Sequence, residues 1–166
     1  MKNVKKLLAV LLALCLLAAM ATVLSACKNS PKSVVKAYLK ALNDRDAEKM
    51  VDMRYPKPML KVFEEEWNED KNDLIGNWEE GFEDIEDEFG DDWKVKDIKI
   101  KDVRDMKKDD VFENLQEDYE DDYNVKFTDA KIVTVDYTIE GENDVEETKD
   151  AEYTVIKYGG KWYIES

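Results

Sequence analysis

Few residues of this chain have side chains suited to covalent chemistry. The sequence holds two cysteines and no histidine among its 166 residues. Cys15 lies inside an uncharged apolar run that extends from Leu7 to Leu24. Cys27 follows that run after two small residues, Ser25 and Ala26. The lack of histidine excludes Ser-His and Cys-His nucleophile pairs and imidazole-bound zinc. The remaining candidates for chemistry are the Cys27 thiol and the carboxylates.

The first 27 residues resemble a bacterial lipoprotein signal peptide. A basic start, Met1 to Lys6, precedes the apolar run, and small residues precede Cys27, as in an export signal. The segment Leu24-Ser25-Ala26-Cys27 is similar to a lipobox, where lipoprotein precursors are lipidated and cut. The resemblance implies removal of residues 1–26 and a diacylglyceryl thioether on the Cys27 sulfur. The alternative is a retained transmembrane helix, because 18 uncharged residues stand at the lower limit for crossing a bilayer.

Such an anchor would hold the rest of the chain on the outer, extracytoplasmic side of the cell membrane. A diacylglyceryl group has two acyl chains, and at about 0.8 kcal/mol per buried CH₂ two chains give durable attachment. We expect residues 27–30 to form the lipidated cysteine and a short tether. Residues 31–166 are then long enough for one compact domain.

The chain is strongly acidic, with 40 acids against 25 bases and a formal net charge of −15. This charge argues against nucleic acid as a partner, and also against anionic lipid and phosphate-rich polymers, because all would be repelled. The acids crowd most densely between Glu117 and Asp122 and could attract divalent cations. None of the acidic runs has the spacing of a calcium-binding hand. We therefore expect a solvated acidic surface, no bound metal and no cofactor.

Hydrophobic periodicity predicts helices in the first part of the mature chain and mainly strands in the last part. Aromatic and aliphatic residues between Met59 and Phe89 recur about every 3.6 positions, with a polar break near residues 68–73. A phase slip near Lys96-Asp97 predicts a β-bulge, and Gly159-Gly160 predicts a hairpin turn with positive φ. The expected helices are 31–42, 46–53, 58–68, 71–89 and 108–123, and the expected strands are 93–100, 133–139, 151–158 and 161–165.

Two stretches resemble nuclear-transport-factor-two-like domains. The opening Ser30 to Asp46, with the sequence SPKSVVKAYLKALNDRD, is similar to their first two helices, and Tyr153 to Tyr163 is similar to their final hairpin. The resemblance implies an α+β fold in which N-terminal helices pack on a curved antiparallel sheet, forming a cone-shaped roll. The order of elements, helices first and an antiparallel meander last, independently indicates the α+β class.

Fold alone does not decide function. Enzymes of the resembled superfamily work with an acid or base deep in the cone, whereas the inward positions here are apolar or aromatic and histidine is absent. We therefore expect no enzyme, but a membrane-anchored domain that binds a partner in the cell envelope. One alternative is a small-ligand cavity lined by Tyr137, Tyr153 and Trp162. Another is an enzyme that uses carboxylates.

Overall fold

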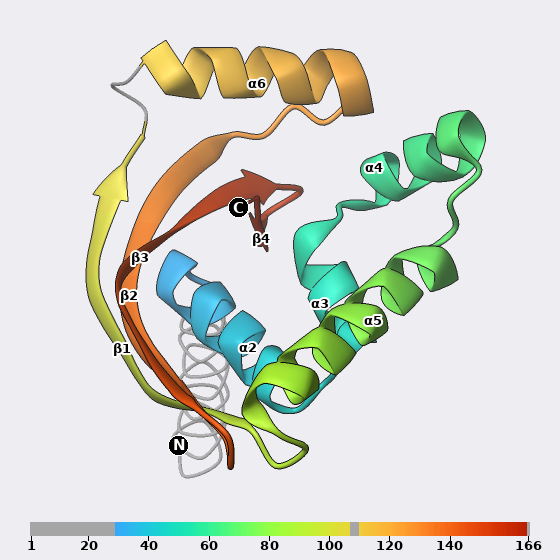
Figure 1. Ribbon diagram of the computed structural model, residues 1–166. Helices are drawn as coiled ribbons and strands as arrows, with labels where there is room; N and C mark the ends of the chain where they lie inside the picture. Colours follow the sequence, from blue (N-terminus) through green and yellow to red (C-terminus); the bar gives the residue numbers. More distant parts are fainter. Residues whose placement is uncertain (1–28, 107–109, 166) are drawn as a thin grey trace, which may run out of the picture.

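In the part of the chain that the structure describes, five α-helices pack against a four-stranded antiparallel sheet as an α+β domain (Figure 1). The computed structural model describes residues 29–106 and 110–165. The predicted signal peptide and the residues Leu24, Ser25, Ala26 and Cys27 lie outside these ranges. The sheet order is β1-β2-β3-β4. In chain order the elements are α2 (Pro31–Asn43), α3 (Ala47–Arg54), α4 (Lys57–Val62), α5 (Lys71–Phe89), β1 (Lys94–Asp105), α6 (Asp110–Tyr123), β2 (Asp129–Glu140), β3 (Val145–Tyr158) and β4 (Lys161–Ile164).

Local sequence explains where α2 and α5 begin. Ser30 caps α2 by accepting a hydrogen bond from the Ser33 backbone N–H, and the Ser33 hydroxyl accepts one from the Ser30 N–H in return. Asp70 and Asp73 form the same reciprocal capping box at α5. Each box satisfies backbone donors that the first helical turn leaves without partners. The predicted break near residues 68–73 is confirmed.

The predicted helix 58–68 needs a correction. It is α-helical only in α4, and it continues as a π-helical turn, Phe63–Trp67. Asn68 then ends this turn with a φ of 57°, a left-handed conformation that asparagine adopts more readily than most residues. The extra residue in the π turn changes which side chains lie above one another, and a strict 3.6-residue period does not reveal this.

Register slips in β1 and β3 bend the sheet at nearly the same level of β2, and β1 has a further slip between Ile100 and Asp102. In β1 the register slips between Lys96 and Lys99, where Asp97 has a φ of 53°, so the predicted bulge is confirmed. In β3 a second slip leaves two residues opposite Asp136, and Asp150 has a φ of 54°. Bulges increase local twist and bending, and they let β1 and β3 extend beyond the lengths predicted from the sequence.

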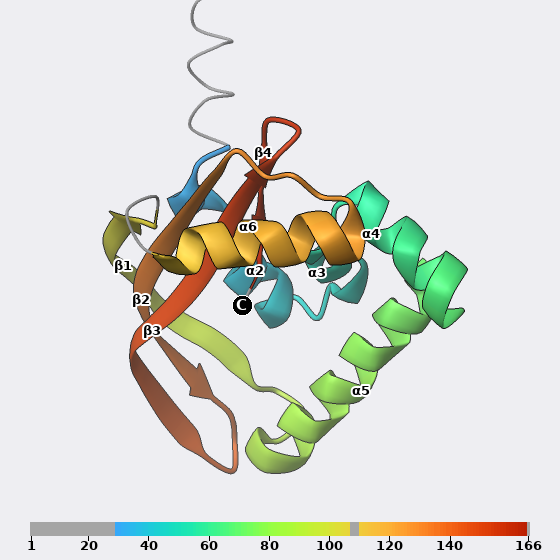
Figure 2. The same ribbon diagram turned by 90° about the horizontal axis from the view of Figure 1, so that it is seen from above.

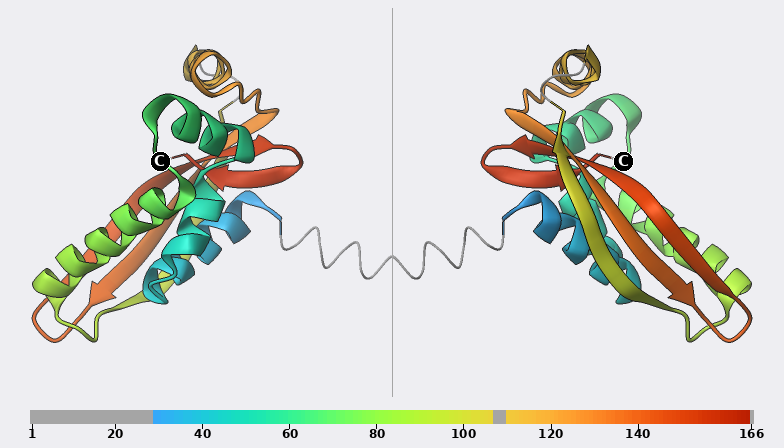
Figure 3. Two further views of the ribbon diagram at one scale, coloured as in Figure 1. Left: turned by 90° about the vertical axis from the view of Figure 1, so that its right-hand side faces the viewer. Right: turned by 90° about the vertical axis from the view of Figure 1, so that its left-hand side faces the viewer.

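Helix α2 lies against the concave side of this bent sheet (Figures 1 and 3). Its inner face buries Val35, Leu39 and Ala41 completely. The main core joins these residues to the sheet and to α5, as the alternation along the strands predicted. Its sheet residues include Val95, Val133, Val135, Val155, Trp162 and Ile164.

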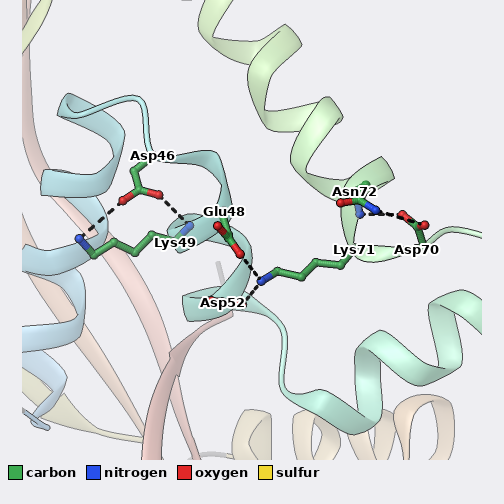
Figure 4. A network of polar contacts seen from close by, with 7 residues as sticks. All are labelled: Asp46, Glu48, Lys49, Asp52, Asp70, Lys71 and Asn72. Atoms are coloured by element: carbon green, nitrogen blue, oxygen red, sulfur yellow. Dashed lines mark hydrogen bonds and ion pairs between the residues drawn. The ribbon is translucent and has the colours of Figure 1, made fainter.

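Helices α3 and α5 are joined by charged groups as well as by apolar contacts. Lys71, at the start of α5, places its Nζ 3.0 Å from a Glu48 carboxylate oxygen and 2.7 Å from an Asp52 oxygen, both on α3 (Figure 4). These partners raise the pKa of Lys71 through hydrogen bonds first. The three side chains are partly or largely exposed, so they orient the helices more than they stabilise them.

Helix α6 crosses one end of the sheet, away from α5 (Figure 2). Phe112 and Tyr119 on α6 contact Phe127 edge-on, with ring centroids 5.3 and 5.8 Å apart. Within the described ranges, no helix combines the length and apolar character needed to cross a membrane.

Candidate ligand-binding groove

A pocket of about 320 Å³ opens between the α4 region and α6. We call it the aromatic groove. Three parts of the chain that are distant in sequence form its walls: the segment from Arg54 through the π turn, the second half of α6, and the end of the last strand. Its lining residues are Arg54, Tyr55, Met59, Phe63, Trp67, Tyr119, Tyr123 and Glu165.

The π turn supplies the most exposed aromatic ring of the groove. Phe63 is buried, and Trp67 stacks on it with ring centroids 4.8 Å apart and an interplanar angle of 27°. The other side of Trp67 is free to meet solvent, since 53% of the residue is exposed. Aromatic residues at helical spacing usually fill a core, and Phe63 does so. Trp67 does not, and π turns are rare and often occur at functional sites.

Tyrosines from α6 form the opposite wall. The ring of Tyr123 meets Phe63 and Trp67 edge-on at centroid distances of 5.9 and 6.2 Å. Tyr119 contacts Tyr123 at 5.4 Å. Burial, followed by the negative charge of Glu165, raises the pKa of Tyr119. Its hydroxyl therefore stays protonated over the physiological pH range.

Arg54 brings a positive charge to the groove. Arg54 is half-buried, and its guanidinium lies 5.9 Å from the centre of the Tyr55 ring. Burial raises the pKa of the nearby Tyr38 hydroxyl, although the positive charge of Arg54 acts to lower it. No carboxylate in the described ranges lies within ion-pair distance of Arg54, although Glu165 lines the same groove. A guanidinium has five donors, so Arg54 retains capacity for an anionic group.

This arrangement suits a ligand with a planar apolar body and one anionic group. The body would stack on Trp67 and meet the tyrosine edges, and the anionic group would accept hydrogen bonds from Arg54. The groove has roughly the size of one small aromatic ligand.

The three residues predicted to line a cavity all belong to the main core, and two of them, Tyr137 and Tyr153, lie close to one another. Tyr153 lies near Tyr137, which contributes to raising its pKa, and its ring meets Tyr38 edge-on at 6.0 Å. Burial is the main cause of the raised pKa of Tyr153. Trp162 instead lines a separate pocket of about 400 Å³ near the start of α2, with Lys157 5.7 Å from its ring centre. A ligand site that includes all three residues stays a prediction.

The acidic residues considered for chemistry have structural or solvent-facing positions in the described ranges. Asp136 accepts a hydrogen bond from the Asp150 backbone N–H at 2.9 Å and lies 3.5 Å from the Lys101 Nζ. That backbone bond is the main reason the pKa of Asp136 is lowered. The acids between Glu117 and Asp122 are exposed around Tyr119, and Lys126 pairs with Glu120. In the same ranges no group of three or more acids is arranged to hold a metal ion.

The sequence did not predict the aromatic groove, because the periodic pattern placed Phe63, Trp67 and Tyr119 on apolar helix faces. One feature of the sequence does indicate that Trp67 is exposed. Trp67 directly follows three consecutive glutamates and precedes the polar break, which places a large ring at a helix end among charges. The facing wall on α6 could not be anticipated, since it depends on how α6 crosses the sheet.

No protein-family model matches the chain, and no curated protein matches it. The function is therefore inferred from the aromatic groove and from the sequence patterns.

Proposed function

We propose that this protein is a lipid-anchored, extracytoplasmic domain that binds a partner or ligand in the aromatic groove rather than catalysing a reaction. The ligand chemistry is an aromatic or otherwise apolar body that bears one anionic group. The observation that carries the binding proposal is Trp67, a large ring that is 53% exposed, stacked on a buried Phe63 and within a groove that also contains Arg54.

The anchor proposal has support from both sequence and structure. The motif Leu24-Ser25-Ala26-Cys27 supplies the site of lipidation. Asn29 is already part of the folded domain, because its Oδ1 accepts a hydrogen bond from the Trp162 N–H at 3.3 Å and its Nδ2 donates one to the Gly160 carbonyl. Two residues span about 7 Å at most, so a lipid on Cys27 would hold the domain against the membrane surface.

We also propose that the fold is the cone-shaped roll implied by the resemblance to nuclear-transport-factor-two-like domains. The support is the bent sheet with α2 against its concave side and the register slips in β1 and β3 that accompany the bend (Figure 1). A solution scattering profile of the purified protein that matches a flat two-layer sandwich better than a cone would count against this.

Two related probes test the groove. The anionic dye 8-anilinonaphthalene-1-sulfonate carries the proposed ligand chemistry, and N-phenyl-1-naphthylamine has the same rings without the sulfonate. Trp67→Ala should weaken the binding of both dyes by about 3- to 10-fold, because ring stacking contributes to the affinity of each. Arg54→Gln should weaken the binding of the sulfonate dye alone, by about 10-fold, because the substitution removes a charged hydrogen-bond donor. Dye fluorescence titrations measure both effects.

Two control variants distinguish dye binding in the groove from dye binding elsewhere on the surface. Lys61→Ala changes an exposed residue of α4, and Arg104→Gln removes an exposed guanidinium on β1. Both should leave the two dyes unaffected. The groove proposal is wrong if Trp67→Ala, with an unchanged melting temperature, binds both dyes as the unmodified protein does. If Arg54→Gln weakens the binding of both dyes equally, Arg54 does not recognise an anionic group of the ligand.

A further inference from the structure

The acidic residues of this chain are unevenly distributed along the sequence. All 40 acids lie at or after Asp44, and no acid precedes it. Three lysines of α2, Lys32, Lys36 and Lys40, lie in the part of the chain that has no acid. The net charge of −15 therefore conceals a local excess of positive charge next to the proposed anchor.

The fold places these lysines on one solvent-facing stripe. They are spaced four residues apart, so they follow one side of the helix. All three are exposed, whereas the opposite side of α2 carries the buried core residues. No ion pair within the described ranges involves any of the three. Their charge is not neutralised by a neighbouring carboxylate.

A fourth lysine joins the stripe from the other end of the chain. The turn between β3 and β4 lies beside the start of α2 (Figures 2 and 3), and the hydrogen bonds of Asn29 to Gly160 and Trp162 fix this contact. Lys161 is exposed at this turn and lines one pocket with Asn29 and Ser33 of α2. One acid, Asp52, also lines that pocket, and Lys71 pairs with it at 2.7 Å.

We infer that the three of these lysines nearest Asn29, Lys32, Lys36 and Lys161, which we call the lysine face, dock on the anionic headgroups of the membrane that carries the lipid anchor. This inference rests on the proposed anchor, because Cys27 stands only two residues before Asn29. Basic residues gain from an anionic bilayer only within about a Debye length of it, roughly 10 Å at 0.1 M salt. The short tether keeps the lysine face within that range, and the acidic remainder of the domain is repelled outward. The inference thus departs, at this face alone, from the expectation that the acidic protein avoids anionic lipid.

Docking would fix the orientation of the domain as well as its distance from the bilayer. A lipid anchor alone allows the domain to rotate about its tether. Attraction at the lysine face, combined with repulsion of the acids elsewhere, selects one orientation. In that orientation the turn between β3 and β4 faces the membrane and the turn between β2 and β3 points away from it (Figure 3).

Lysine acetylation tests the inference on the lipidated protein reconstituted in vesicles. One set of vesicles contains only phosphatidylcholine, and the other contains phosphatidylcholine mixed with phosphatidylglycerol. We expect acetylation of Lys32, Lys36 and Lys161, measured by mass spectrometry, to fall several-fold on the anionic vesicles and to recover at high salt. Lys94 and Lys149, exposed near the far end of the sheet, serve as internal controls and should react equally on both.

Charge reversal gives a second measurement. The double variant Lys32→Glu and Lys36→Glu should lose the protection of Lys161, since each lysine near an anionic surface contributes about a fivefold gain. The matched variant Lys94→Glu and Lys149→Glu should keep it. Equal acetylation of the lysine face on the two vesicle types would overturn the docking inference. Failure of the anchor is distinguishable, because the protein would then not float even with vesicles of phosphatidylcholine alone.

Discussion

At the scale of single residues, Gly141 shows how closely two elements approach. A methyl group at this position would overlap the carbonyl oxygen of Phe89 at the end of α5, and the same oxygen accepts a hydrogen bond from the Asn143 N–H at 3.1 Å. We expect Gly141→Ala to lower the free energy of unfolding by about 1–3 kcal/mol, because the chain must move to relieve the overlap. Urea denaturation measures the change.

Gly76 provides the matched comparison. It lies inside α5 with open space around its Cα, so Gly76→Ala should raise the free energy of unfolding by about 0.5–1 kcal/mol through helix propensity. A destabilised Gly76→Ala, or a Gly141→Ala as stable as the unmodified protein, would contradict this view of the two glycines.

The tyrosines give a residue-scale prediction about pH. Burial raises the pKa values of Tyr38, Tyr119 and Tyr153 above 10 in the folded state, whereas an unfolded chain titrates tyrosine near about 10. The unfolded state therefore releases these protons first. The stability from their protonated burial is complete below pH 10 and declines as the pH rises above it. Urea midpoints between pH 8 and 11 should fall only in the upper part of this range, and a constant midpoint would disagree.

At the scale of elements, Arg45 joins the α2–α3 junction to the end of α5. Its Nε lies 2.8 Å from Glu86, its Nη2 donates to the Asp91 carbonyl at 2.6 Å, and its guanidinium lies 4.4 Å from the centre of the Trp93 ring. Arg45→Met should cost about 1–3 kcal/mol of unfolding free energy, because two charged hydrogen bonds and a cation–π contact are lost together.

Lys49→Met is the control for Arg45→Met. The pair between Lys49 and Asp46 is 3.8 Å long and exposed, so its loss should cost less than about 0.5 kcal/mol. If Arg45→Met is no more destabilising than Lys49→Met, Arg45 does not hold these elements together.

Periodicity and turn residues predicted most elements, including the starts of α2 and α5, the bulge at Asp97 and the glycine turn before β4. These features depend on neighbours in sequence. The π turn and the second bulge at Asp150 were not predicted, because the first depends on packing against α6 and the second on the register with β2. The aromatic groove was missed for the same reason, since its walls come from α4, α6 and the last strand.

At the scale of the whole molecule, the charge distribution and the proposed lipid anchor favour the same orientation on a membrane. Lys32 and Lys36 of the lysine face follow the proposed lipid site closely in the sequence, and every acid of the chain lies at or after Asp44. The molecule is therefore polarised, with a basic side suited to a membrane and an acidic remainder suited to solvent. The aromatic groove is formed by α4 and α6 rather than by the lysine face, so docking would not require its residues.

The same scale gives a prediction for Cys27. Cys27→Ser should block lipidation and leave an unprocessed precursor, because the thioether cannot form and cleavage requires it. Cys15→Ser is the matched control, since Cys15 lies in the segment that we expect to be removed, and it should be processed normally. Immunoblots of membrane fractions distinguish the longer precursor from the mature form. Processing of Cys27→Ser at the normal site would show that Cys27 is not the modified residue.

The intact mass of the protein purified from bacterial membranes is the most direct test of the lipid-anchored account. We predict a mass that lacks residues 1–26 and includes a diacylglyceryl group on Cys27. A free Cys27 thiol, or a chain that retains Met1 to Ala26, would contradict it.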